Sequence, residues 1–176
     1  MNWYESVFEV IDLRSFSNLW YWIGLAVLWS SVSHWVLGVP HDMILRARRE
    51  KGGQAMEDLH DLTRVNVNRI LYISDVSGAW LLLLGSTFMT ILALTAFYYD
   101  VELSQAVFLL LFPLTILGLL SIRTARKIRS EGDRDTALIR RLMRHRLTTQ
   151  IIGFLSIFVT AMFGMYKNLY VGPFGF

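Results

Sequence analysis

The stretch VSGAWLLLLGSTFMTILALTAFYY, residues 76–99, contains no Asp, Glu, Lys or Arg. A helix needs about 20 apolar residues to cross the roughly 30 Å hydrocarbon core of a bilayer, so this stretch is long enough to span a membrane. Three more stretches without these residue types reach the same length, at residues 15–41, 103–122 and 147–166. We therefore predict an all-α protein, an integral membrane four-helix bundle in a single domain of residues 1–176. The predicted spans are residues 17–39, 74–99, 103–122 and 147–168.

Composition supports this class. The 176 residues are 54% hydrophobic and 18% charged, whereas soluble domains are about 45–50% apolar and about 25% charged. The chain has no cysteine, which excludes disulfides and thiolate ligands. No phosphate-binding glycine loop, nucleophile elbow or His-Glu-x-x-His zinc motif occurs in the sequence. We therefore expect no enzyme activity, no catalytic residues and no metal site.

The Lys and Arg residues gather in two segments. All 17 except Arg14 and Lys167 lie in residues 40–73 or 123–146, which connect the first span to the second and the third to the fourth. Because Lys and Arg are retained on the cytoplasmic side, we predict that both segments are cytoplasmic and that both termini lie outside. Residues 1–14 place apolar and acidic side chains on opposite faces of a helix, which predicts a helix lying in the membrane interface.

Helix signals continue into both cytoplasmic segments. Pro40 suits the first turn of a helix that would end at Gly52-Gly53, and the apolar positions that follow predict an amphipathic helix running into the second span. We expect the third span to continue to about Ser130, with Asp133 or Asp135 capping the next helix. These helices would project from the bundle as cytoplasmic extensions.

A polar intramembrane cluster is predicted near the cytoplasmic ends of the spans. Its members fall at a similar depth: Asp75, His34, Arg123 and Gln150. A carboxylate that faced lipid would be costly, so Asp75 needs a partner or water. Two readings stay open. Asp75 forms an ion pair at headgroup level with Arg123 or an arginine near His145, or the cluster binds a small polar ligand or carries protons.

Histidines offer a second candidate chemistry. His34 and His145 fall at matched depth on the first and fourth spans, and helix bundles can hold haem between facing histidines. The alternative is interfacial histidines bonded to water or lipid. Glu57 and His60 have the spacing of one half of a di-iron site, but the second half is missing, which favours a solvated acidic face. We expect no resident cofactor, with haem as the alternative.

The segment 123–146 is strongly basic. It carries nine Lys or Arg against three acidic residues, a net charge of +6. Each basic residue beside an anionic leaflet contributes about 1 kcal/mol to binding, so we expect contact with anionic lipids or an acidic partner. No aromatic interleaving accompanies these charges, so nucleic acid is not an expected partner. The predicted contact residues are Arg126, Lys127, Arg129, Arg140, Arg141, Arg144 and Arg146.

Small residues recur at intervals of three and four in the fourth span, at Gly153, Ser156, Thr160 and Gly164. Such spacing lets the backbone of a neighbouring helix approach closely. We therefore predict that these four residues form a helix-packing face.

Three runs carry a resemblance: NWYESVFEVIDLRSFSNLWYWIGLAVLWSSVSHWVLGVPHDM, RVNVNR and SIFVTAMFGMYKNLYVG, at residues 2–43, 64–69 and 156–172. They resemble small alphaproteobacterial four-span membrane proteins that are identified as a component of the SufBCD iron–sulfur assembly complex. The resemblance implies a membrane anchor or accessory role. It implies no cluster ligands on this chain, since the chain contains no cysteine.

We expect a non-catalytic inner-membrane subunit, or an accessory or assembly factor, of a larger membrane complex. The sequence also leaves open a small homo-oligomeric channel or transporter with a polar path near Asp75 and, as a third class, a haem or quinone redox protein.

Overall fold

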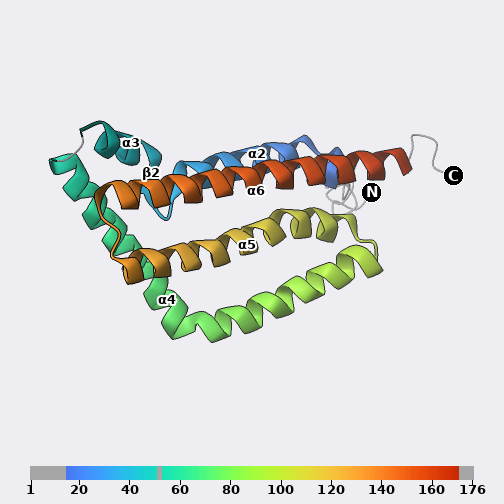
Figure 1. Ribbon diagram of the computed structural model, residues 1–176. Helices are drawn as coiled ribbons and strands as arrows, with labels where there is room; N and C mark the ends of the chain where they lie inside the picture. Colours follow the sequence, from blue (N-terminus) through green and yellow to red (C-terminus); the bar gives the residue numbers. More distant parts are fainter. Residues whose placement is uncertain (1–14, 51–52, 171–176) are drawn as a thin grey trace, which may run out of the picture.

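The computed structural model describes residues 15–50 and 53–170 (Figure 1). The predicted interfacial helix of residues 1–14 lies outside the described residues. The elements in chain order are η1 Ser15–Ser17, α2 Leu19–His34, β1 Trp35–Val36, β2 Val39–Pro40, α3 His41–Glu50, α4 Gln54–Ala93, η2 Leu94–Tyr98, α5 Glu102–Glu131 and α6 Asp135–Tyr170. Helices dominate, so the all-α prediction is confirmed.

Three helices are long and apolar enough to cross a membrane, in the ranges Gln54–Tyr98, Glu102–Glu131 and Asp135–Leu169. The predicted span at residues 17–39 does not appear as one continuous helix. Its helix, α2, has 16 residues and rises about 24 Å at about 1.5 Å per residue, short of the hydrocarbon core. The structure therefore shows three helices of transmembrane length among the described residues, and not the four that we predicted.

The early end of α2 has a local cause. After His34 the chain turns into a short antiparallel hairpin in which Val36 pairs with Val39. The two turn residues, Leu37 and Gly38, have φ angles of +53° and +77°, the left-handed pair that a tight two-residue hairpin turn requires. A right-handed helix cannot continue through such angles. Asn66 of α4 stabilises the turn, because its Nδ2 donates a hydrogen bond to the Gly38 carbonyl at 3.1 Å.

The largest core lies at the end of the molecule that contains α3, the first half of α4 and the turn between α5 and α6. We call this the basic end. Its buried apolar residues come from the hairpin and from four helices: Val36, Leu37, Val39, Ile44, Ala47, Met56, Leu59, Val67, Leu71, Ala125, Ile128, Leu138, Ile139 and Leu142. The hairpin tip is part of this cluster, so the chain between α2 and α3 is a packed element.

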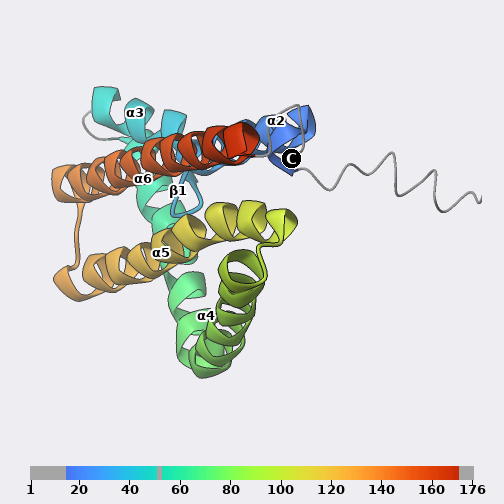
Figure 2. The ribbon, with the colours of Figure 1, turned by 90° about the vertical axis from the view of Figure 1, so that its right-hand side faces the viewer.

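The remaining half of the molecule, the apolar half, is packed much more loosely. Its buried cluster consists of Leu25, Trp29 and Leu117, from α2 and α5. Figures 1 and 2 show α2 and α6 side by side, α5 beside them, and the later half of α4 on the outer side of α5. Each residue from 79 to 88 of α4 is exposed. A helix turns through all directions in ten residues, so this part of α4 presents its whole circumference to the surroundings.

At the α5–α6 turn, one helix end follows from a sequence signal and the other does not. The helix α5 ends at Gly132, whose φ of +61° is the left-handed conformation that favours glycine at a helix C-terminus. The helix α6 then begins at Asp135. The predicted cap from Asp133 is not formed, because the Asp133 carboxylate accepts instead from Nε of Arg141. The α5–α6 turn is thus closed by an ion pair.

Candidate functional site

The predicted polar cluster does not assemble. His34, Asp75, Arg123 and Gln150 lie on α2, α4, α5 and α6, and all four are exposed. No hydrogen bond or ion pair joins these four residues, all of which lie within the described part of the chain. Figure 1 shows that the later half of α4 runs on the far side of α5 from α2 and α6.

Asp75 finds its partner on α5. Its Oδ1 lies 3.9 Å from Nη2 of Arg126, and the same nitrogen donates to Oγ of Ser74 at 3.3 Å. Asp75 therefore pairs with an arginine, as one of the two interpretations expects. The arginine is Arg126, which lies one helical turn after Arg123. Both side chains are more than 60% exposed, so in water this pair would contribute well under about 1 kcal/mol.

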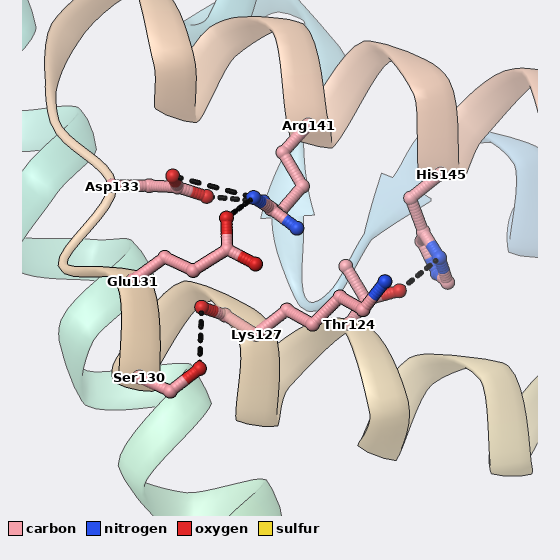
Figure 3. Close-up of polar contacts among 7 residues, drawn as sticks. All are labelled: Thr124, Lys127, Ser130, Glu131, Asp133, Arg141 and His145. Carbon is pink, nitrogen blue, oxygen red and sulfur yellow. Dashed lines mark hydrogen bonds and ion pairs between the residues drawn. The ribbon is translucent and has the colours of Figure 1, made fainter.

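His145 joins two helices. It is buried, with Nε2 at 3.3 Å from Oγ of Ser121 and Nδ1 at 3.2 Å from Oγ1 of Thr124; Figure 3 shows the Thr124 contact. Both ring nitrogens thus have hydroxyl partners on α5. Each hydroxyl already donates its single proton to a backbone carbonyl, Ser121 to Leu117 and Thr124 to Leu120, both at 2.8 Å. A neutral imidazole therefore donates to one hydroxyl, and the second contact becomes a hydrogen bond only when that hydroxyl turns its proton from the carbonyl to the ring. The arrangement gives His145 a positioning role between α5 and α6, and ligation of haem by this residue would require one of these contacts to open.

The cations of the basic segment differ in exposure. Arg141 is clasped at the α5–α6 turn by the carboxylates of Asp133 and Glu131, as Figure 3 shows, and its side chain is only 23% exposed. Arg141 therefore closes the α5–α6 turn, and its predicted contact with lipid or a partner stays a prediction. The exposed cations on α5, the turn and α6 are Arg123, Arg126, Lys127, Arg129, Arg134, Arg140 and Arg144.

Arg146 also differs from the exposed set. It is half-buried, and its Nε is buried with no hydrogen-bond partner among the described residues. Burial lowers the pKa of His41, and the charge of Arg146, which is close enough to act on that side chain, lowers it further. Arg146 is thus placed against the start of α3, whereas the exposed cations face outward.

A cleft at the basic end was not anticipated from the sequence. It has a volume of about 790 Å³ and lies between α4 and the α5–α6 turn. Within it, Nε2 of His60 lies 3.1 Å from Oδ1 of Asp135 and 3.2 Å from the backbone nitrogen of the same residue. His60, which the sequence favours as a solvated side chain, therefore contacts the first residue of α6. These two residues are 75 positions apart, so no local pattern could have identified the contact.

The small residues of α6 face α2 and η1. A Cβ added to Gly153 would lie 2.7 Å from Cε3 of Trp29, and one added to Gly164 would lie 3.2 Å from Cδ1 of Phe16. Ser156 and Thr160, between these two glycines, are buried. The close approach of α2 to α6 thus depends on glycine at position 153.

The described residues contain no group of three or more His, Asp or Glu side chains that could hold a metal ion. Comparison with protein families, with curated proteins and with solved structures finds no match to this chain.

Proposed function

We propose that this protein is a non-catalytic integral membrane subunit or accessory factor of a larger membrane complex. In this proposal the apolar half lies in a bacterial inner membrane, the basic end is cytoplasmic and both termini are periplasmic. Three spans come from α4, α5 and α6. The fourth is α2, with η1 extending its crossing and the hairpin placed at the inner interface.

The observation that carries the proposal is the exposure of α4. Of the most apolar 18-residue window of this helix, only 6% is buried. Trp80, Leu82 and Leu84 are each more than 60% exposed. Contiguous apolar surface of this extent is characteristic of contact with lipid or with another protein. Because α5 alone accompanies the later half of α4, a partner helix has open access to most of its circumference.

The basic end supplies a second contact surface. Seven exposed cations flank the α5–α6 turn, and this density favours binding to the anionic inner leaflet or to an acidic surface of the partner. The resemblance in the sequence makes the iron–sulfur assembly machinery the first partner to test.

The experiment is purification of the full chain from its native membranes in a mild detergent, followed by native mass spectrometry. We expect a heteromeric complex. The matched variants are Gly85→Phe on α4 and Gly24→Phe on α2; at both positions an added Cβ meets nothing within 4 Å. The α4 variant should lose the partner and the α2 variant should keep it. Recovery of free monomer alone, or of a homo-oligomer that conducts ions in liposomes, would contradict the proposal.

A further inference from the structure

A second, smaller hollow lies between α4 and α5, where the charged basic end meets the apolar half. Its volume is about 500 Å³, and it is lined by Leu71, Asp75, Arg126, Arg129 and Ser130. On α4, the uncharged stretch 76–99 begins directly after Asp75. On α5, Arg123 is the first charged residue after the uncharged stretch 103–122. If the apolar half lies in the membrane, as proposed above, this hollow is at the level of the lipid headgroups.

The charges in the hollow are mixed and incompletely paired. Asp75 and Arg126 approach only to 3.9 Å, a loose contact between two exposed side chains. Arg129 is exposed and forms no ion pair among the described residues. One carboxylate therefore stands beside two guanidinium groups, with the hydroxyl of Ser130 nearby. A ligand that suits this set carries one phosphate and one ammonium group.

We propose that this hollow binds the headgroup of a phospholipid with a primary amine, that is, of the phosphatidylethanolamine class. The phosphate is placed against Arg126 and Arg129, since guanidinium groups form strong charge-assisted hydrogen bonds to phosphate oxygens. The ammonium is placed against the carboxylate of Asp75.

Charge and hydrogen bonding distinguish this headgroup from the other common ones. A glycerol headgroup has no cation for Asp75, so the carboxylate would keep only its loose contact with Arg126. A choline headgroup carries a positive charge but no N–H group, so it donates no hydrogen bond to the carboxylate. The ethanolamine headgroup satisfies both the arginines and Asp75.

The surroundings suit the rest of the lipid. Val76 and Trp80 of α4 are more than 60% exposed, and Leu119 of α5 is 52% exposed. These apolar side chains follow the hollow along both helices in the direction of the apolar half. The acyl chains of a lipid whose headgroup occupies the hollow would lie against them.

The test uses the purified full-length protein in nanodiscs made from equal amounts of phosphatidylethanolamine, phosphatidylcholine and phosphatidylglycerol. The lipids that stay bound after transfer to detergent are counted by native mass spectrometry. We expect the ethanolamine lipid to be retained about tenfold over the choline lipid, as one charge-assisted hydrogen bond implies. Asp75→Asn should remove this preference, and Asp75→Glu should keep it. Arg129→Gln should weaken retention of all three lipids.

Asp58→Asn is the matched control, because Asp58 is an exposed carboxylate elsewhere on α4 and should leave the preference unchanged. Retention of the preference for ethanolamine over choline in Asp75→Asn, or loss of this preference in Asp58→Asn, would overturn the inference. A failure of membrane location looks different, because the protein would then be recovered in the soluble fraction. If the protein is in the membrane but retains the three lipids in the proportions supplied, the proposed headgroup site is refuted and the proposed membrane location is not.

Discussion

At the scale of single residues, Gly38 in the hairpin turn is constrained both by its backbone conformation and by a close neighbour. Gly38 has a φ of +77°, and a Cβ there would lie 3.0 Å from Cγ of Asn66. We expect Gly38→Ala to destabilise the protein by about 1–3 kcal/mol, from backbone strain and overpacking together. The measurement is chemical unfolding in a mild detergent. Gly24→Ala is the control, because it adds the same methyl group to a helical position where nothing lies within 4 Å. Equal stability of the two variants would contradict the expectation.

A second residue-scale prediction concerns Asp100, in the turn between η2 and α5. Its carboxylate forms a hydrogen-bonded ion pair with Lys167 and accepts from Nε2 of Gln105 at 2.7 Å. The hydrogen bond from Lys167, then that from Gln105, then the charge of Lys167, lower the pKa of Asp100 below its ordinary value of 3.8. The folded state therefore binds this proton less readily than the unfolded state does.

A group with a lowered folded-state pKa stabilises the fold at pH values above its unfolded pKa, and this contribution is lost as the pH falls through the folded pKa. We expect Asp100→Asn to lower the melting temperature at neutral pH and to have progressively less effect below about pH 4. Melting curves in detergent from about pH 3 to about pH 7 test this. Asp58→Asn, which removes a carboxylate without an ion pair among the described residues, is the control. A loss that did not depend on pH would speak against the Lys167 contact.

At the scale of the elements, the packing of α2 on α6 depends on Gly153. A Cβ at this position would lie 2.7 Å from Cε3 and 3.1 Å from Cδ2 of the Trp29 ring, which is itself buried. We expect Gly153→Ala to displace α2 and destabilise the protein by about 1–3 kcal/mol. The same substitution at Gly85 of α4 meets nothing within 4 Å and should have little effect or a small stabilising one. The measurement is the free energy of unfolding in detergent. The fluorescence of Trp29 alone cannot be followed, because the chain has six tryptophans.

The elements also show how far the sequence predicts the fold. Absence of charge identified the apolar parts of α4, α5 and α6, because a span in lipid requires a continuous apolar run. The same criterion placed the end of the first span too late. Residues 35–40, WVLGVP, are as uncharged as the helix before them. Their turn is fixed by left-handed angles at Leu37 and by burial against α4, and uncharged composition does not report either.

The candidate site was harder to predict than the fold. Depth along the sequence placed Asp75, His34, Arg123 and Gln150 at one level, but it contains no information about direction around each helix. The bend of α4 and the rotation of each helix decide which of them meet, and the observed pair is Asp75 with Arg126. Net charge similarly could not separate Arg141, which closes the α5–α6 turn, from the exposed cations beside it.

At the scale of the whole molecule, the two halves differ in what stabilises them. The basic end has a core to which the hairpin and four helices contribute, whereas the apolar half buries a cluster of three residues. The basic end therefore has the packing of an ordinary folded unit. The apolar half leaves most of its hydrophobic surface exposed, and in our proposal lipid or a partner that covers α4 stabilises it.

The orientation of the molecule can be tested directly because the chain has no cysteine, so each cysteine variant carries a single thiol. Ser130→Cys places a thiol at the end of α5 in the basic end, and Val101→Cys places one in the turn before α5, at the opposite end of that helix. Both positions are exposed.

Lys and Arg are retained on the cytoplasmic side, and the Ser130 end carries nearly all of them. In cells with a permeabilised outer membrane, we expect a membrane-impermeant maleimide to label Val101→Cys at once and Ser130→Cys only after lysis. The reverse labelling pattern would show that the orientation is inverted. Equal labelling of both variants before lysis would place the two ends of α5 in one compartment, which contradicts a membrane-spanning α5.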